Sequence, residues 1–339
     1  MSRKLFRTSM VACGSLLLVT AFATFTGAQQ RGIRTPLQTP PPINPDFARM
    51  EIEALPVQGK VHMLAGAGSN IAVQIGDTGV VIVDTGHEKM ADKTLAAVRK
   101  LTNKPIRTII YTTLADAHTG AAATFVRAGS QNQAGPGVGQ RPNEGDLIAT
   151  ANILRLMTEI GETKIPTDRW PPSTFHVKQK DFYANDEPVV IEAVKDAVTA
   201  GDALVWFRKS DVVVTGDIFD QTSYPFIDLE HGGSINGILA GLNRILEITV
   251  PAHLQEGGTM VIPGHGRISD EHDVLEYRDM VTIIRDRVQC AIGKGMTLAQ
   301  IHAQKPSFTY EYDLRFGKNP AWTPTMFVEA IHKSLTARR

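Results

Sequence analysis

The sequence has few cysteines and no excess of either charge. Its two cysteines are Cys13 and Cys290, and its 35 lysines and arginines balance 35 aspartates and glutamates. A neutral chain has no electrostatic attraction for nucleic acid or an anionic membrane, so neither is expected as a partner. No Ser-His-Asp arrangement, P-loop or dinucleotide-binding glycine pattern stands out, because Gly66-Ala67-Gly68 is too short for the last of these.

The N-terminal apolar run, residues 11–22, is too short for a convincing membrane span. It follows the positive residues Arg3, Lys4 and Arg7, and it precedes small residues that suit signal peptidase. This order is typical of a secretory signal peptide over residues 1–28, which predicts a periplasmic or extracellular protein. An uncleaved anchor is the alternative. After cleavage, no stable membrane span is expected.

Cleavage would also change the charge and the cysteine content of the chain. It removes three positive residues and no acids, which leaves 32 against 35 and a net charge of −3. It removes Cys13 as well, so that no intrachain disulfide is possible. The remaining Cys290 falls on an apolar predicted helix, where we expect it to be a small buried hydrophobic residue.

Residues 29–50 are rich in proline and glutamine and predict an extended tether, so the folded domain is expected to begin at residue 51. Two β-rich halves follow, each closed by helices, and this order favours an α/β or α+β fold with two sheets packed face to face. Strands are predicted at residues 61–64, 71–75, 80–83, 106–111, 189–194, 203–207, 212–214 and 260–263. Helices are predicted at 89–101, 147–160, 234–248, 273–292 and 298–303, with a short C-terminal helix and a surface loop at 128–146.

Polar residues gather where four of the predicted strands end. The stretches are Asp84-Thr85-Gly86, residues 112–120, Thr215-Gly216-Asp217 and Pro263-Gly264-His265-Gly266. Loops at the ends of a rigid sheet are where binding and catalytic sites are usually built. The sequence therefore predicts a site formed by these four loops.

The stretch 111–120 reads Tyr-Thr-Thr-Leu-Ala-Asp-Ala-His-Thr-Gly, and it resembles the zinc-binding stretch of the metallo-β-lactamase superfamily. That family's motif is His-x-His-x-Asp-His after a buried strand. If His118 is the last histidine, Thr113 and Ala115 stand in place of the first two, and Ala117 stands in place of the aspartate. The resemblance implies a four-layer αββα sandwich of class α+β over residues 51–300, with a C-terminal helical extension at 301–339.

The resemblance also implies how much of the family's two-metal site remains. A later His-Thr-x-Gly-Asp stretch gives the first metal its third histidine, and here Val198 stands at that position. Threonine, alanine and valine are poor or impossible zinc ligands, so the first metal site is expected to be absent. For the second metal, His118, Asp217 and His265 match the family and predict a site for one zinc ion at most.

Four further residues are candidates for roles around this site. Asp84 is expected to orient a ligand, and Asp202 ends the later stretch in a similar supporting position. Asp116 lies next to Ala117 and is a candidate to lend a carboxylate to the metal. Tyr224 follows Asp217 on a run expected to line the mouth, where it is a candidate to contact substrate.

Two functions of different classes remain open. The first is a secreted hydrolase of ester, thioester or lactam-type bonds that uses one surviving metal. The second is a metal-free pseudoenzyme that binds a small molecule or a partner in the old cleft, whose floor would be small and apolar. In the second case His118 is an ordinary hydrogen-bonded residue, Asp217 accepts bonds from its turn, and His265 lies in a tight turn.

Overall fold

The structure is a computed structural model that describes residues 46–130, 145–307 and 310–337. These residues all belong to the second of two compact units, which comprises residues 34–339. The predicted signal peptide and residues 29–45 of the predicted tether lie outside the described residues. Within the described ranges, no helix is long and apolar enough to cross a membrane.

Seven of the described strands form one sheet, in which they lie in chain order. Neighbours are antiparallel from the first strand to the fourth and parallel from the fourth to the seventh. The strands are β1 (Glu53–Gln58), β2 (Val61–Ala65), β3 (Ile71–Gly76), β4 (Gly79–Val83), β5 (Ile106–Ile110), β6 (Asp146–Thr150) and β7 (Ser173–Phe175).

The other five described strands form a second sheet in the order β12-β11-β10-β9-β8. Only the pair β11 and β12 is parallel, and the remaining neighbours are antiparallel. The strands are β8 (Gln179–Ala184), β9 (Glu187–Val194), β10 (Asp202–Phe207), β11 (Val212–Val214) and β12 (Met260–Ile262).

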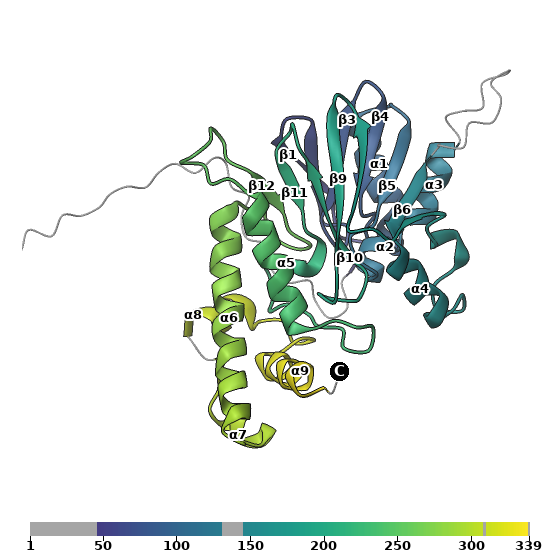
Figure 1. The fold of residues 1–339 in the computed structure, drawn as a ribbon. Helices are drawn as coiled ribbons and strands as arrows, with labels where there is room; N and C mark the ends of the chain where they lie inside the picture. The colour runs from purple at the N-terminus through teal and green to yellow at the C-terminus, as the bar shows by residue number, and fades with distance from the viewer. Residues whose placement is uncertain (1–45, 131–144, 308–309, 338–339) are drawn as a thin grey trace, which may run out of the picture. The chain divides into compact units, whose positions relative to one another are not determined.

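The helices cover the outer faces of both sheets, with α1, α3 and α4 beside the first sheet and α5 and α6 beside the second (Figure 1). The described helices are α1 (Ala91–Leu101), α2 (Asp116–Thr119), α3 (Ala122–Ser130), α4 (Ala151–Ile160), α5 (Ile235–Ile248), α6 (Glu271–Gly293), α7 (Leu298–Ala303), α8 (Tyr310–Phe316) and α9 (Pro324–Thr336). Three 3-10 turns accompany them, η1 (Glu88–Met90), η3 (Thr167–Arg169) and η4 (Gly216–Ile218).

The alternation of side chains along the strands creates the layers. In β4, Val81 and Val83 point into the apolar core between the sheets, whereas Val80 and Ile82 join the core under α1, α3 and α4. Every residue of this strand is buried, as expected for a strand covered on both faces. A third core lies between the second sheet and the helices α5, α6 and α9. The fold is therefore the α+β, four-layer αββα sandwich that the sequence predicted.

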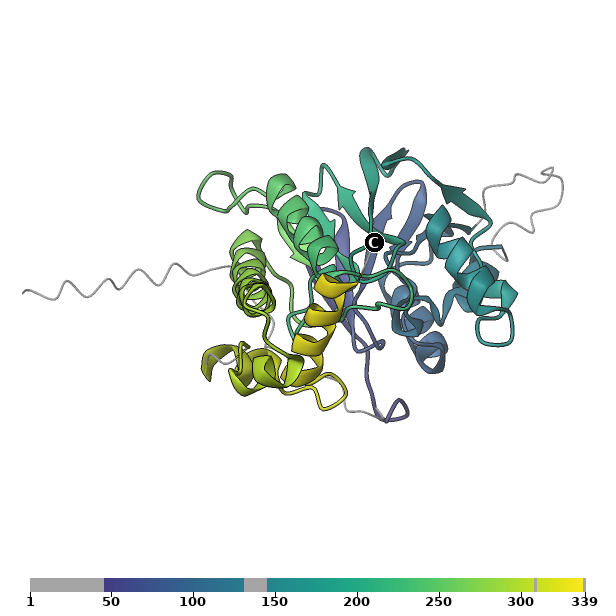
Figure 2. The same ribbon diagram turned by 60° about the horizontal axis from the view of Figure 1, so that its bottom comes forward.

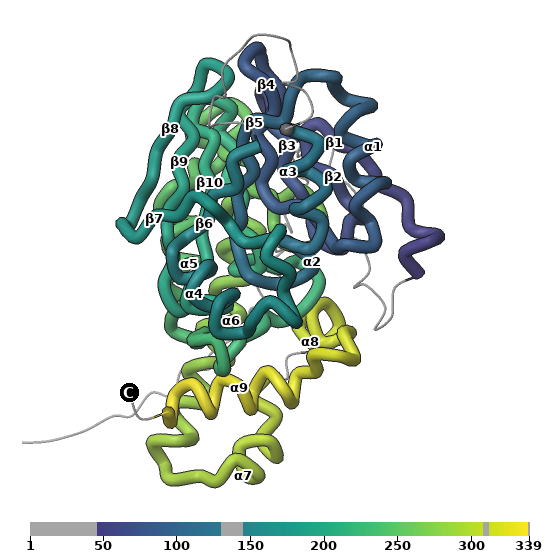
Figure 3. Tube along the Cα trace, turned by 90° about the vertical axis from the view of Figure 1, so that its right-hand side faces the viewer, coloured from purple at the N-terminus to yellow at the C-terminus, as the bar shows by residue number. Residues whose placement is uncertain are grey.

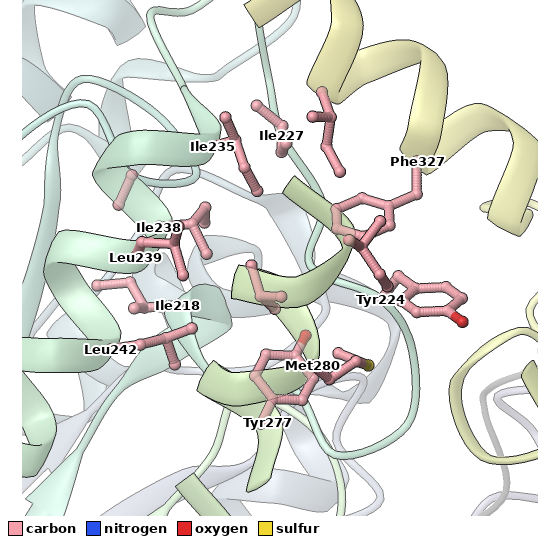
Figure 4. Close-up of a cluster of buried hydrophobic side chains, with 14 of the residues drawn as sticks. Ile218, Tyr224, Ile227, Ile235, Ile238, Leu239, Leu242, Tyr277, Met280 and Phe327 are labelled. Carbon is pink, nitrogen blue, oxygen red and sulfur yellow. The ribbon is translucent and has the colours of Figure 1, made fainter. Parts of the chain in front are cut away.

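The C-terminal helices are part of this third core. Ile301, Phe316 and Phe327 come from α7, α8 and α9, and all three are buried in the same cluster as α5 and α6. Figure 3 shows α9 beyond the end of the sheets at which α2 also lies, and in Figure 2, where this end comes forward, the yellow C-terminal helix lies in front. Figure 4 shows Phe327 among the side chains of this cluster. Apolar packing therefore joins the C-terminal helices to the sandwich.

Two local expectations are corrected by the structure. The predicted helix at 147–160 is strand β6 followed by α4, and Thr150 caps the helix by accepting a bond from the amide of Ile153. A short buried apolar run does not distinguish strand from helix by its periodicity. Cys290 is exposed rather than buried, because it lies about 200° around α6 from the buried Val288.

We expect Phe327→Ala to lower the free energy of unfolding by about 3–5 kcal/mol, because it empties a fully buried aromatic site. The neighbouring Met326 is 42% exposed, so Met326→Ala is the matched control and should change stability by less than about 1 kcal/mol. Chemical denaturation of both variants measures the difference. Equal effects would show that α9 does not contribute to the core.

Candidate metal centre

The four polar loops follow strands whose carboxyl ends meet at one end of the sandwich. β4 is parallel to β5 in the first sheet, and β11 is parallel to β12 in the second. Asp84 directly follows β4, and His118 lies in α2 after β5. Asp217 lies in η4 after β11, and His265 follows β12. The topology thus places one side chain from each of four loops at the same edge.

Three of these side chains converge on a common point. The ligand atoms of His118, Asp217 and His265 all lie within 4.8 Å of one another. Nε2 of His118 is 3.0 Å from Oδ1 of Asp217, and Nε2 of His265 is 3.3 Å from the same oxygen. Within the described residues, this is the one group of three or more such side chains close enough to share an ion.

The three side chains are mostly buried, and their exposure to solvent is uneven. The side chain of His118 is fully buried, whereas those of Asp217 and His265 are 17% and 19% exposed. The two imidazole rings meet edge to face, with their centroids 5.7 Å apart. Access from solvent is therefore through Asp217 and His265, with His118 at the back.

Asp84 holds His118 from behind. Its Oδ2 lies 2.8 Å from Nδ1 of His118, and its two oxygens also accept bonds from the amide and the hydroxyl of Thr112. The backbone of Asp84 has a φ of 63°, in the left-handed region that few side chains adopt. A carboxylate at Nδ1 keeps the proton on that nitrogen and leaves Nε2 free to bind on the opposite side.

The donor set fits one zinc ion. Two imidazoles and a carboxylate are common zinc ligands, and ligands about 2.0–2.1 Å from a tetrahedral zinc lie roughly 3.3 Å from each other. Two of the three separations, 3.0 and 3.3 Å, match that spacing, and the third pair of ligand atoms lies within 4.8 Å. Without an ion the two contacts of His118 are hydrogen bonds, for which it must carry a proton on both nitrogens because each faces a carboxylate, and His265 lies at ion-pair distance from Asp217.

Electrostatics favour positive charge in this pocket. Burial opposes protonation of His118, but the carboxylates of Asp217 and Asp84 overcome it and hold the pKa of His118 well above its usual range. Burial also acts against ionisation of Asp217, yet His118 and His265 together lower its pKa. Asp217 is thus ionised in a site that holds or attracts cations.

The resemblance implies missing ligands at Thr113, Ala115 and Val198 for the first metal and at Ala117 for the second, and none of these positions carries a comparable group. The hydroxyl of Thr113 donates to Oδ1 of Asp202 at 2.8 Å, and Thr113 and Val198 are 1% and 3% exposed. Ala115 is exposed, and Ala117 is half-buried. These side chains include no nitrogen or carboxylate, so they do not fit a second ion.

Asp202 supports the loops of the site. It accepts bonds from the amide and the hydroxyl of Thr199 and from the hydroxyl of Thr113. Burial raises the pKa of Asp202 to about 7, although these hydrogen bonds act in the opposite direction. The carboxyl group of Asp202 therefore bonds to two threonines, and Asp202 does not join His118, Asp217 and His265 at the shared point.

Asp116 lies outside the group as well, which corrects its expected role as a substitute ligand. Its carboxylate pairs with Nη1 of Arg169 at 2.6 Å and with Nε2 of His87 at 3.1 Å. Its side chain is 52% exposed. As the first residue of α2, it points away from His118, because residues two positions apart in a helix project about 200° apart.

Tyr224 is also not where the sequence placed it. It is fully buried, its ring stacks on Phe327 with centroids 5.0 Å apart, and its hydroxyl donates to Asp313 at 2.6 Å. Figure 4 shows this ring packed beside Phe327. The expectation that it contacts a ligand is corrected: Tyr224 anchors the loop after Asp217 to the C-terminal helices.

The sequence did not single out Asp220 or Asn70, which the structure places next to the group. Burial raises the pKa of Asp220, which interacts with His265 and Asp217 and accepts bonds from Thr222 and Ser223. An aspartate two residues before a threonine is a common turn signal, so its sequence predicted only a turn. Asn70 contacts the turn that carries His265.

Comparison with known proteins agrees with this architecture. A family model described as the metallo-beta-lactamase superfamily matches residues 64–270, more than half of the 339 residues. The chain belongs to this superfamily. No curated protein sequence matches it.

Solved structures show the same fold at low sequence identity. The inverting sec-alkylsulfatase Pisa1 from Pseudomonas sp. is 14% identical, with a TM-score of 0.62, and the match covers 86% of this chain and 51% of that one. A metallo-β-lactamase from Pontibacter korlensis is 14% identical, with a TM-score of 0.51, and the match covers 68% of this chain and 99% of that one. The superfamily member described here thus spans about half the length of the alkylsulfatase.

The likeness to the alkylsulfatase extends beyond the family model. Residues 1–270 make up about four fifths of the chain, so a match over 86% must include part of the segment after residue 270. That segment contains α6 to α9. At least part of this helical segment therefore has a counterpart in a second member of the fold.

We expect the Asp202 carboxyl group to make stability depend on pH. An unfolded aspartate has a pKa of about 3.9, so between about pH 4 and about pH 7 the folded chain binds more protons than the unfolded chain. Stability should therefore fall as pH rises through this window. In Asp202→Asn this part of the slope should vanish, because the amide group does not titrate in this range. The threonine hydroxyls can turn to accept from the amide, so the loop should keep its structure.

The measurement is the free energy of unfolding at pH 5 and pH 8 for both proteins. Asp181→Asn, at an exposed carboxylate on β8, is the control and should keep the slope of the unaltered protein. If Asp202→Asn keeps that slope as well, the Asp202 carboxyl group is already ionised at pH 5.

Proposed function

We propose that this chain is a hydrolase whose site holds at most one zinc ion, bound by His118, Asp217 and His265. The observation that carries the proposal is their convergence within 4.8 Å, with Asp84 behind His118. The substrate bonds would be esters, thioesters or lactams. The likeness to an alkylsulfatase adds sulfate esters to this class. We further propose that the protein is exported, as its N-terminal residues predict.

Each residue of the site would have a separate role in this reaction. Asp84 holds the Nδ1 proton of His118, so that Nε2 faces the shared point. Asp217 neutralises positive charge there, and His265 closes the group from the more exposed side. A bound zinc ion would lower the pKa of a water molecule and polarise the substrate oxygen. Thr113 and Val198 leave no partner for a second ion, so turnover is expected to be slow.

The expected zinc content after dialysis is at most one ion per chain, and never two. His265→Ala should abolish binding, because it removes one of only three ligands, while the fold survives the loss of a partly exposed side chain. His231→Ala is the matched control, since His231 pairs with Asp228 outside the group. Elemental analysis measures the content, and circular dichroism checks the fold.

Turnover of an activated ester should rise with added zinc up to one equivalent and disappear with a chelator and in His265→Ala. Two tightly held ions would contradict the proposal, because unaligned residues would then have replaced the missing ligands. Undiminished turnover by zinc-free protein would also contradict the proposal, because catalysis would then not need the metal.

A second candidate function is a metal-free module that binds a small molecule with an apolar group. The segment 221–228 follows Asp217 and is held at both ends. At its start the amide of Gln221 donates to the carbonyl of His265, and at its end the amide of Asp228 donates to the carbonyl of Val198. Phe226 lies in this segment, and its side chain is 47% exposed. Its ring meets Trp322 edge to face at 4.8 Å. An exposed phenylalanine packed on a half-buried tryptophan favours an apolar ligand.

For this candidate we expect octanoate to bind in calorimetric titration, and Phe226→Ala to weaken its binding about tenfold or more. Tyr183→Ala removes an aromatic side chain that is 70% exposed on β8 and should leave the affinity unchanged. Binding that persists equally in both variants would mean that the pair is not the binding surface.

A further inference from the structure

The segment between β2 and β3 reaches across to the second sheet at Asn70. Its backbone amide donates to the carbonyl of Gly264 at 2.8 Å. Its side-chain nitrogen donates to the carbonyls of Pro263 and Gly266, each at 3.0 Å. Asn70 is 3% exposed. Three hydrogen bonds from one buried residue therefore hold the turn at residues 263–266. His265 is the residue of this turn whose side chain can bind a metal.

The side chain of asparagine suits this task because its NH₂ group has two donors at a fixed angle. Each donor is used on one end of the turn, so the separation of Pro263 and Gly266 is set by a single planar group. A turn held at both ends limits the positions that its central side chain can take. Asn70 thus fixes the direction in which His265 leaves the turn.

The turn must be held closely because it lies directly against Asp217. A Cβ added to Gly264 would be 2.2 Å from Oδ1 of Asp217 and 2.8 Å from the carbonyl carbon of Gly216. The amide of Gly264 donates to the carbonyls of Gly216 and Phe219 at 2.9 and 3.0 Å. A small movement of the turn would therefore change the distance between His265 and the shared oxygen of Asp217.

The residue before Asn70 makes the corresponding contact on the first sheet. The hydroxyl of Ser69 donates to the carbonyl of Ala117 at 2.7 Å, and Ala117 directly precedes His118. Ser69 is also 3% exposed. Two adjacent residues of one segment therefore touch the two histidine-bearing loops, which come from different sheets.

We propose that Asn70 is a positioning residue that sets His265 against His118 and Asp217, with Ser69 bracing the His118 side. This proposal rests on the proposed function in so far as the three side chains bind a metal. It concerns the position of His265, however, which Asn70 would fix even before an ion binds. Supporting groups of this kind typically change metal affinity by about 10–100-fold when they are removed.

The test compares Asn70→Ala with Asn185→Ala. Asn185 is a matched control because it is also buried, and its side-chain nitrogen also gives two hydrogen bonds, to Gln74 and Gly79, at the opposite end of the strands. Cobalt(II) is the probe, and its visible absorption reports both affinity and coordination. We expect Asn70→Ala to weaken cobalt binding about 10–100-fold and to shift the absorption bands, and Asn185→Ala to do neither.

A second readout uses no metal. In the metal-free protein, the imidazole NMR signals of His265 should shift or broaden in Asn70→Ala and stay unchanged in Asn185→Ala. If the unaltered protein binds no cobalt, the proposed function fails, and the role of Asn70 is judged on the NMR signals alone. Unchanged His265 signals in Asn70→Ala would overturn the positioning role.

Folding of the variants is controlled separately. If Asn70→Ala does not fold, Asn70→Ser keeps one donor and should show a smaller change of the same kind. An equal effect of Asn70→Ser and Asn185→Ala on the His265 signals would show that Asn70 only joins the two sheets. Ser69→Ala removes a single bond, so its expected effect falls on the His118 signals and is weaker.

Discussion

The site depends on one buried carboxylate that two imidazoles share. Asp217 Oδ1 is within 3.3 Å of both His118 and His265. A carboxylate taken out of water is costly unless positive charge or hydrogen-bond donors replace the solvent. The absence of a side chain at Gly264 lets the His265 turn approach Asp217. Asp84 then fixes the imidazole of His118 from behind, and Asn70 fixes the backbone of the turn that carries His265.

The surrounding carboxyl groups explain why the pocket favours a cation. Asp84, Asp217 and Asp220 interact with the two histidines, and Asp202 interacts with Asp217, so that four acidic groups stand against two basic ones. The pKa shifts of His118, Asp202 and Asp220 all act to reduce this negative excess, because each group tends to keep a proton that it would lose in water. A divalent cation would balance the same charge with fewer protons. Bound protons and a bound metal ion are thus alternative ways to neutralise the same excess of negative charge.

The sequence predicted the parts of the fold that depend on local pattern. The strand ends and the helix predicted at 234–248, which is α5, follow from short-range signals, whereas the four-layer sandwich was implied by the resemblance. The residues that converge at the site were found because the family's motif marks them. The side chains that brace them were not, because the contacts of Asn70 join residues almost two hundred positions apart.

The errors of prediction have the same origin. Asp116 and Tyr224 were placed by their neighbours in sequence, but distant partners decide where they point. Arg169 draws Asp116 away from His118, and Phe327 and Asp313 bury Tyr224. A sequence pattern gives the position of a residue along an element, whereas the direction of a polar side chain depends on which charge or acceptor the rest of the chain brings near it.

The vacated positions differ from the retained ones in space as well as in chemistry. Thr113 and Val198 are almost fully buried, and the Thr113 hydroxyl is already bonded to Asp202. A Cβ added to Gly233 would lie 2.1 Å from the carbonyl oxygen of Val198, so the following loop packs closely on this stretch. A histidine at either position would need volume that the packed interior does not offer, since overpacking a close-packed core is itself costly. The protein itself thus fills the space around Thr113 and Val198, where the resemblance implies the first metal, while His118, Asp217 and His265 bring their ligand atoms together and the last two stay partly exposed.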